Sequence, residues 1–401
     1  MKVFDDLERR GLVKQTTNTD KIRSFLNENQ ITFYIGFDPT ADSLHVGHLL
    51  QIVTAKRLAD AGHRPIMLIG GATALVGDPT GKSEMRKMLS RSEIRVNAEA
   101  IGVQIQKIMG QEIWMVNNLE WFENENFLTL LRNIGPHFSV NNMLRSECFK
   151  SRMEHGLSFL EFNYMIMQAE DFRVLNASED CVLQVGGDDQ WSNILAGIDL
   201  IHKKEKREAF GLTLPLLVNS DGTKMGKTEK GTVWLDPQKT SPFEFFQFWR
   251  NIPDDKVNDC FNFFTFFPPF DGKDIFLDIN NAKKNLAFEI TKLVHGESAA
   301  QQALEQAEAL FEKRDTSELA ATPILEGTHI LDVVIKCGFA RSRTDARNLI
   351  ANRGITINDE VQTNPTITIS RTTFGNELIV RKGKKNFCRL LIEDKCLDQT
   401  P

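Results

Sequence analysis

A short strand that breaks into a helix carrying two histidines is the feature that most constrains this chain. Apolar side chains alternate over residues 31–35 as in a buried β-strand, Gly, Asp and Pro interrupt the pattern at 36–39, and an apolar-periodic helix is predicted from about 44 to 61. His45 and His48 are three residues apart, so they share one face at the start of this helix, beside backbone N–H groups that have no partner within the helix. A helix end of this kind is suited to holding a polyphosphate.

The residue types around these histidines add to that interpretation. Gly47 lacks a side chain, so a flat group such as adenine can approach the backbone closely. Taken alone, however, the pattern His-Val-Gly-His is equally compatible with surface histidines or metal-binding histidines.

A second motif, Asp-Gly-Thr-Lys-Met-Gly-Lys-Thr at 221–228, follows about 180 residues downstream. Lys224 and Lys227 are three residues apart, with a glycine between them and a turn-forming Asp-Gly before them, which suits a mobile cationic loop. By itself this segment is also compatible with a solvated surface loop. Together the two motifs resemble the paired signatures of class I aminoacyl-tRNA synthetases, in that family's order and spacing. The flanking sequence is similar to the bacterial type of tyrosyl-tRNA synthetase, from near residue 30 to the C-terminal module.

The predicted elements indicate an α/β fold. Short β-rich runs are separated by helical stretches, which is typical of a doubly wound, Rossmann-like parallel sheet. The predicted strands are 31–35, 65–70, 112–117, 181–186 and 213–218. The candidate loops follow these strands, where such sheets bind ligands.

Three domains are expected along the chain. A catalytic domain that binds ATP and tyrosine is expected over 1–230, and a helical domain with a phenylalanine-rich core over 231–318. A linker at 315–328 precedes a small α+β RNA-binding domain over 328–401. By resemblance, the helical domain faces the anticodon arm of tRNA.

The charge of the chain is unevenly distributed. From residue 330 to the end there are 12 Lys and Arg against 8 Asp and Glu, a net charge of +4, so the rest carries −10 within a total of −6. A basic terminal domain fits local contact with RNA, although a soluble basic tail explains the charge equally well. Within it, Arg341, Arg343 and Arg347 are predicted near one face of a helix over 340–350, where they suit a phosphate backbone. The alternative is an ordinary amphipathic helix.

Cellular context can be estimated from the same composition. The N-terminus has no apolar core of a signal peptide, and no apolar run reaches the length of a membrane span. The six cysteines are scattered without a Cys-x-x-Cys pair, which argues against a zinc site and fits a reducing cytosol. We therefore expect a cytoplasmic protein that has no membrane partner and no protein-bound metal.

Tyrosine is conspicuously rare in this chain, with two tyrosines against 28 phenylalanines. The positions that keep a hydroxyl, Tyr34 and Tyr164, are candidates for needing it. Tyr164, Gln168 and Asp171 are spaced i, i+4 and i+7, so they share one face of a helix, and a polar stripe there is costly unless it meets a ligand. The resemblance implies that Tyr164, Gln168 and Asp78 hold the ammonium group of tyrosine. It also implies that Tyr34 and Asp171 bond the phenolic hydroxyl.

The resemblance implies roles for further residues. ATP is expected to arrive as its Mg²⁺ complex. The residues expected to act in catalysis, on the phosphates and ribose of ATP, are Thr40, His45, His48, Lys224, Lys227 and Thr228. Those expected to bind ATP or the adenylate are Asp38, Gly47, Gly187 and Asp189, and Gln190 is expected near the tyrosine carboxyl. Those expected to bind tRNA(Tyr) are Lys82, Arg86, Arg341, Arg343 and Arg347. Two residues depart from the family pattern: Asp188 replaces the usual Ser, and Ile35 replaces a Cys, which predicts the loss of a minor ribose contact.

The implied activity is tyrosine activation by ATP followed by transfer to tRNA, in a homodimer whose interface includes 134–140 and Phe159. Four other protein classes fit the residues less well. A tryptophan-specific synthetase is disfavoured by Tyr34 and Asp171, since indole has one donor at a different position. A small-molecule nucleotidylyltransferase is disfavoured because such enzymes lack the helical and RNA-binding modules expected here. A non-catalytic paralogue is disfavoured because both motifs are intact in this chain. A P-loop NTPase is excluded because each Walker-like segment has three residues between its glycines and not four.

Overall fold

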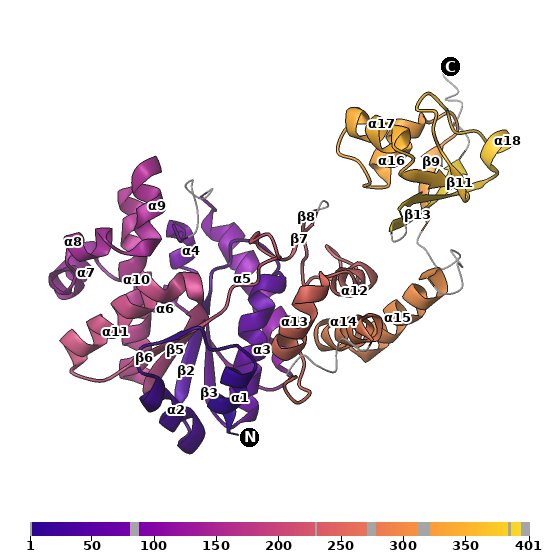
Figure 1. Ribbon diagram of the computed structural model, residues 1–401. Helices are drawn as coiled ribbons and strands as arrows, with labels where there is room; N and C mark the ends of the chain where they lie inside the picture. Colours follow the sequence, from indigo (N-terminus) through magenta and orange to yellow (C-terminus); the bar gives the residue numbers. More distant parts are fainter. Residues whose placement is uncertain are drawn as a thin grey trace. The chain divides into compact units, whose positions relative to one another are not determined.

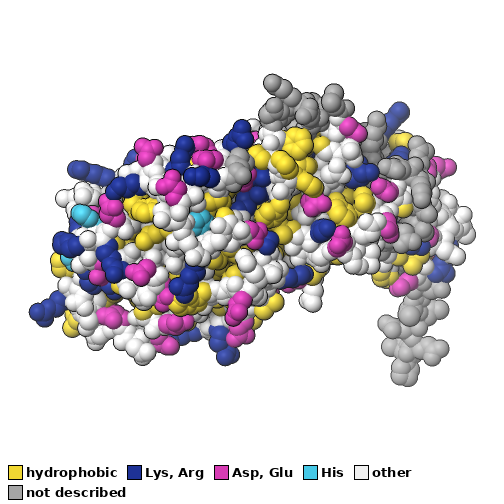
Figure 2. Space-filling model, turned by 90° about the horizontal axis from the view of Figure 1, so that it is seen from below, with side chains coloured by type: hydrophobic (Ala, Val, Ile, Leu, Met, Phe, Trp, Pro, Cys, Tyr) yellow, Lys and Arg dark blue, Asp and Glu magenta, His cyan; other side chains and the backbone are white. Residues whose placement is uncertain are grey.

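The computed structural model of the chain describes residues 2–80, 88–228, 231–270, 278–311, 321–383 and 386–393. The fold consists of two compact units, Met1–Ala300 and Gln301–Pro401 (Figure 1). Lys and Arg side chains are interspersed with Asp and Glu over the face drawn in Figure 2.

A six-stranded sheet forms the centre of the first unit (Figure 1). Its strands are β1 (Gln15–Thr16), β2 (Thr32–Phe37), β3 (Arg64–Ile69), β4 (Trp114–Asn117), β5 (Cys181–Gly187) and β6 (Phe210–Leu214). Their order is β1-β6-β5-β2-β3-β4, with β2 to β6 parallel and the edge strand β1 antiparallel to β6. The chain proceeds from β2 to β4 on one side and returns to β5 on the other. The carboxyl ends of β2 and β5 therefore form the switch point at which such sheets bind ligands.

Helices connect the parallel strands and lie on both faces of the sheet, which confirms the predicted doubly wound class (Figure 1). The helices of this part are α1 (Val3–Arg9), α2 (Thr19–Glu28), α3 (Val46–Asp60), α4 (Thr73–Val76), α5 (Arg91–Met109), α6 (Leu119–Phe122), α7 (Phe127–Ile134), α8 (Val140–Leu144), α9 (Glu147–His155), α10 (Phe159–Glu179) and α11 (Trp191–Glu205). The long helix α10 begins at a capping box of Ser158 and Glu161 and ends at Asp180, whose φ is 48°.

The last predicted strand, 213–218, was wrong in its position. The strand β6 lies at 210–214 because Pro215 has no N–H to continue the ladder. Gly211 lies inside β6, and a Cβ there would come within 2.3 Å of Ile194 Cγ2, so this glycine lets α11 pack closely on the sheet. The short edge strand β1 was not predicted.

A helical bundle follows the sheet, as the phenylalanine-rich sequence predicted. Its helices are α12 (Pro242–Arg250), α13 (Val257–Phe264), α14 (Ile279–His295) and α15 (Glu297–Phe311). Phe245, Phe246, Trp249 and Phe264, on α12 and α13, are fully buried, whereas Phe266 is 46% exposed.

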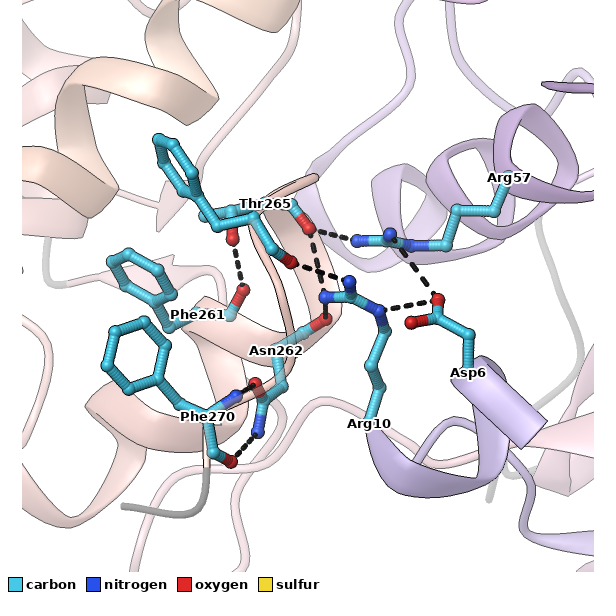
Figure 3. Close-up of polar contacts among 8 residues, drawn as sticks. Asp6, Arg10, Arg57, Phe261, Asn262, Thr265 and Phe270 are labelled. Atoms are coloured by element: carbon cyan, nitrogen blue, oxygen red, sulfur yellow. Dashed lines mark hydrogen bonds and ion pairs between the residues drawn. The ribbon is translucent and has the colours of Figure 1, made fainter. Parts of the chain in front are cut away.

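Two buried arginines join α1 and α3 to the C-terminal end of α13 (Figure 3). We call this cluster the arginine hub, and its residues are Asp6, Arg10, Arg57, Asn262, Thr265 and Phe267. Arg10 donates to Asp6 Oδ2 at 2.7 Å and to the carbonyl of Asn262 at 3.1 Å. Arg57 donates to the carbonyl of Thr265, which also accepts from Arg10 at 3.2 Å, and its Nη1 lies 3.9 Å from Asp6 Oδ2. Burial, followed by the nearby Arg10, lowers the pKa of Arg57 to about 10. The carbonyls at the end of α13 carry partial negative charge, so they offset the two like charges.

The second unit has its own sheet and core. Its elements are β9 (Ala321–Leu325), α16 (Ile330–Lys336), α17 (Arg343–Ala351), β10 (Ile355–Ile357), β11 (Glu360–Val361), α18 (Arg371–Phe374), β12 (Glu377–Lys382) and β13 (Asn386–Glu393). The strand order is β11-β10-β12-β13-β9. The linker expected over 315–328 is wrong for 321–325, which form β9. Pro323 is tolerated there because β9 is an edge strand.

Candidate active site

A cavity of about 350 Å³ opens at the carboxyl ends of β2 and β5. It brings together fourteen of the predicted site residues: Tyr34, Asp38, Thr40, His45, Gly47, His48, Asp78, Tyr164, Gln168, Asp171, Gly187, Asp189, Gln190 and Lys224. They come from segments almost 200 residues apart, which the parallel sheet gathers at one edge.

Buried polar side chains form the floor of the cavity. Tyr34 is 1% exposed, and its hydroxyl has no hydrogen-bond partner. Asp171 accepts bonds from Asn118 Nδ2 at 3.1 Å and from Trp121 Nε1 at 2.9 Å. Burial raises the pKa of Asp171 to about 8, although these two bonds act in the opposite direction, and burial together with Asp171 raises the pKa of Tyr34. The floor therefore offers a hydroxyl and a carboxyl group to a polar atom of a ligand.

Gln184 on β5 also belongs to this floor, although it was not predicted. It pairs in register with Tyr34 on β2, is 3% exposed, lines the cavity, and its Oε1 has no partner. A polar residue within the apolar strand sequence Cys-Val-Leu-Gln-Val was the signal that could have found it. Asn118 and Trp121 were missed as well, and only their position just after β4 marks them.

The middle of the cavity is held by bonds between its own polar side chains. Tyr164 donates its hydroxyl to Asp38 Oδ2 at 2.8 Å, and Thr73 donates to the other oxygen at 2.7 Å. Gln190 donates to Asp78 Oδ2 at 2.8 Å. Burial, and then Asp38, raises the pKa of Tyr164. These contacts fix the carboxylates of Asp38 and Asp78 in place beside the cavity, where they can attract a cationic group.

The two histidines cap α3, and here one expectation was wrong. The N–H groups expected to be unpaired at the start of the helix all have partners: that of Gly47 donates to His45 Nδ1 at 3.0 Å, and that of His48 to the carbonyl of His45. The N–H of His45 donates in turn to His48 Nδ1 at 3.3 Å, and the two rings stack 3.9 Å apart. Because both Nδ1 atoms accept, each neutral ring carries its proton on Nε2. A Cβ at Gly47 would lie 2.8 Å from His45 Cε1, so the glycine makes room for this ring.

The lysine loop reaches the opposite wall. Lys224 Nζ lies 3.8 Å from Asp189 Oδ2. Burial raises the pKa of Asp189, and Lys224 acts against that shift. A Cβ at Gly187 would lie 2.8 Å from Asp189 Oδ1, so the glycine allows this carboxylate to fold over the backbone. Lys227 and Thr228 form β7 (Lys227–Thr228), which pairs with β8 (Gly231–Thr232), and their side chains lie outside the described part of the chain.

Comparison with known proteins identifies the family. Residues 26–312 match the family described as tRNA synthetases class I (W and Y), and residues 307–390 match the tyrosine–tRNA ligase C-terminal domain. The chain is 48% identical over 404 residues to a tyrosine–tRNA ligase of Clostridium botulinum, covering 98% of this chain and 99% of that protein. It belongs to the tyrosine–tRNA ligases. A Clostridium kluyveri relative is also 48% identical, with the same coverage. The crystal structure of a C-terminally truncated mitochondrial tyrosyl-tRNA synthetase from Aspergillus nidulans superposes with a TM-score of 0.70 at 31% identity, covering 77% of this chain and 94% of that one.

Asp188 and Ile35, the two residues expected to depart from the family pattern, are not among the residues that line the cavity. Asp188 accepts from Gln15 Nε2 at 2.7 Å and from Thr213 Oγ1 at 2.9 Å, so it joins the edge strand β1 to β6. Ile35 is fully buried and is not among the residues that line the cavity. Asp188 therefore has a structural role that sequence reasoning did not find.

The arginines expected to bind tRNA lie on the second unit, but not in the predicted arrangement. Arg341 precedes α17, where only Arg343 and Arg347 lie, because Ser342 caps the helix. Arg343 forms two bonds to Asp332 on α16, so its charge is partly neutralised. Lys82 and Arg86, also expected to bind tRNA, lie outside the described residues.

Over the described ranges, no group of three or more His, Cys, Asp or Glu side chains is placed to hold a metal ion. Within the same part of the chain, no helix has the length and apolar character to cross a membrane.

Proposed function

We propose that this tyrosine–tRNA ligase activates tyrosine with MgATP in the cavity at β2 and β5 and transfers it to the terminal adenosine of tRNA(Tyr). The single observation that carries the choice of amino acid is the unpaired hydroxyl of Tyr34 beside Asp171. A phenolic hydroxyl can accept from Tyr34 and donate to Asp171. Phenylalanine would leave the Tyr34 hydroxyl unpaired, at about 1–3 kcal/mol, and would give Asp171 no partner beyond Asn118 and Trp121.

The other residues of the cavity bind the remaining groups of the amino acid and the parts of ATP. Asp78, Tyr164 and Gln168 hold the ammonium group, and Gln190 lies near the carboxylate. Asp38, Gly187 and Asp189 face the adenylate and its ribose, and Thr40, His45 and Lys224 face the phosphates. These assignments are supported by the shared cavity and by the fixed orientation of Asp78 and Asp38.

The chemical step needs no general base, because the attacking carboxylate is already ionised near pH 7. It attacks the α-phosphate in line, a mixed carboxylic–phosphoric anhydride forms as the bond from the α-phosphorus to the bridging oxygen breaks, and pyrophosphate leaves. Catalysis then consists of positioning and of stabilising the charge on the leaving group, which His45, Lys224, Lys227 and Thr228 supply. Mg²⁺ arrives with the substrate ATP.

The test is ATP–pyrophosphate exchange over a panel of amino acids, followed by charging of tRNA. Exchange that depends on tyrosine and is at least a hundred-fold weaker with phenylalanine and tryptophan supports the proposal. Equal exchange with tryptophan would overturn the choice of substrate, and no exchange with any amino acid would overturn the activity.

The same protein is proposed to act as a homodimer. Exposed apolar side chains occur on α7, on α8 and at the start of α10: Phe127 (58% exposed), Leu128 (73%), Val140 (57%) and Phe159 (69%). Phe138, also placed in the predicted interface, packs partly against the core and is not freely exposed. Several large apolar side chains left exposed between residues 127 and 159 support an interaction site in this part of the chain. Sedimentation should give a dimer at micromolar concentration and a monomer for Phe159→Asp, and a stable wild-type monomer would refute the proposal.

The division into catalytic, helical and RNA-binding domains, 1–230, 231–318 and 328–401, is proposed on the same basis, as is the cytoplasmic location. The latter is supported by the five cysteines within the described ranges, none of which forms a disulfide. Because phosphate contacts dominate RNA affinity, removing residues 312–401 should preserve ATP–pyrophosphate exchange and cripple tRNA charging. Loss of both activities together would instead assign the second unit a role in folding.

A further inference from the structure

The segment that follows the lysine loop crosses directly over the start of α3. The N–H of Val46 donates to the carbonyl of Val233 at 3.3 Å, and the N–H of Leu235 donates to the carbonyl of Leu44 at 2.8 Å. Between these bonds, His45 and Trp234 form an isolated antiparallel bridge. The backbone thus places Trp234 opposite the first histidine of the motif, and we call residues 231–240 the strap.

The side chain of Trp234 continues this contact into the cavity. Its ring centroid lies 6.3 Å from that of His45, with the planes tilted by 54°, and Trp234 is one of the residues that line the cavity. The His45 ring also stacks on His48, and its Nδ1 accepts the N–H of Gly47. The orientation of His45 therefore depends on Trp234, on His48 and on its own helix cap.

The outer part of the strap is anchored as well. Lys239 Nζ lies 5.4 Å from the centroid of the Trp234 ring and forms an ion pair with Asp42, whose pKa it lowers. The N–H of Trp234 donates to Thr240 Oγ1 at 3.0 Å. The indole is thus held between a cation and the His45 imidazole.

The strap also connects the histidines to the lysine loop. The N–H of Val233 donates to the carbonyl of Gly226 at 2.8 Å. Gly226 has a φ of +90°, and a Cβ there would lie 2.2 Å from Val46 Cγ2, so the loop packs directly on the first turn of α3. A displacement of the loop would therefore also shift Trp234 and His45.

We propose that Trp234 is a positioning residue for the adenylation step. It fixes the His45 imidazole in the orientation that the leaving pyrophosphate requires and acts through that ring, without contact to the reacting atoms. This inference rests on the proposed function. A misplaced catalytic group commonly costs one to two orders of magnitude in rate, so a loss of about ten-fold is expected on removing the indole.

A double-mutant cycle tests the proposal. Trp234→Leu should lower the adenylation rate about ten-fold while the tyrosine dissociation constant stays within about two-fold, and Trp234→Phe should retain most of the rate. In a His45→Asn background, where Asn can still cap the helix, Trp234→Leu should change the remaining rate less than about two-fold.

Equal losses in both backgrounds, or a weakening of tyrosine binding that matches the loss in rate, would overturn the proposal. If Trp234→Leu does not fold, Lys239→Met serves in its place: it frees the outer face of the indole and should cost about two- to three-fold, again only when His45 is present. Absence of tyrosine-dependent exchange in the wild type would refute the proposed function itself, whereas an additive cycle with an active wild type refutes only this inference.

Discussion

The arginine hub and the floor of the cavity both bury polar side chains, but the hub bonds its charged groups to one another and to the main chain, whereas the floor leaves two polar atoms without a partner. In the hub, two guanidinium groups meet one carboxylate and three main-chain carbonyls, and only the Nε of Arg57 has no partner (Figure 3). On the floor, the hydroxyl of Tyr34 and the Oε1 of Gln184 are sealed from water without a partner. A buried polar group without a bond costs free energy, so the floor is held at the expense of stability. The hub therefore stabilises the fold, and under the proposed function the two unpaired atoms of the floor find their partners in the bound substrate.

The largest expected effect comes from breaking the hub. Asp6→Ala removes the carboxylate shared by Arg10 and Arg57 and should lower the free energy of unfolding by about 3–5 kcal/mol, because two buried like charges remain. Urea denaturation measures it. The control is Asp5→Ala on the same helix, whose pair with Arg23 at 3.8 Å is exposed, so less than about 1 kcal/mol is expected. Similar losses for the two variants would remove the distinction between a buried hub and a surface pair.

A charge in the cavity should behave in the opposite way. Lys224→Ala breaks only a half-exposed pair with Asp189, so stability should change by less than about 1 kcal/mol. The adenylation barrier, however, should rise by about 3 kcal/mol, because in the proposed mechanism the lysine stabilises charge that develops on the leaving phosphates. Rapid-quench kinetics and tyrosine titration separate the two effects. A parallel loss of tyrosine affinity would contradict a role confined to the transition state.

His295 tests whether an unpaired group outside the cavity also costs stability. It packs edge-on against Phe245, neither ring nitrogen has a hydrogen bond, and burial, then Lys107, lowers its pKa to about 4, while Asp236 acts in the opposite direction. Since the unfolded chain binds a proton near pH 6.5 and the folded one only near 4, this contribution to stability is full above pH 6.5 and is lost as the pH falls toward 4. At pH 5 the loss should be about 2 kcal/mol.

The measurement is the change in unfolding free energy between pH 7 and pH 5 for the wild type and for His295→Leu. The variant should lose about 2 kcal/mol less than the wild type over this interval, because all other titrating groups are common to both. Identical pH dependence would mean that His295 is not buried as an uncharged ring.

Much of this architecture is readable from local sequence signals. Periodicity predicts the strand that ends at Gly36 and Phe37, and it predicts the polar stripe of Tyr164, Gln168 and Asp171. The parallel topology then brings both to one edge of the sheet. The motif lysine and histidines are likewise found from residue type and spacing.

The hub was beyond prediction for a physical reason. Arg10 and Thr265 are 255 residues apart, and one arginine in a short helix has the same local pattern whether it faces water or a distant carbonyl. The paired N–H groups of α3 were missed because a histidine was treated as a ligand-binding group, when it is also the helix cap. Pairing between distant polar groups leaves no periodic trace in the sequence.

The smallest expected effect is the most direct test of the comparison between the hub and the floor. The chain contains only two tyrosines, and their hydroxyls differ in whether they form a hydrogen bond. The hydroxyl of Tyr164 donates to Asp38, whereas that of Tyr34 has no partner. Tyr34→Phe should therefore raise the unfolding free energy of the ligand-free protein by about 1 kcal/mol, and Tyr164→Phe should lower it by a similar amount.

In the presence of tyrosine the Tyr34→Phe variant should lose its stability advantage, since the substrate hydroxyl would have bonded to Tyr34 in the wild type. The preference of this variant for tyrosine over phenylalanine should also fall. Thermal unfolding with and without tyrosine measures both. If Tyr34→Phe is destabilised without ligand, the hydroxyl is already satisfied within the fold, and the contrast between the hub and the floor no longer holds.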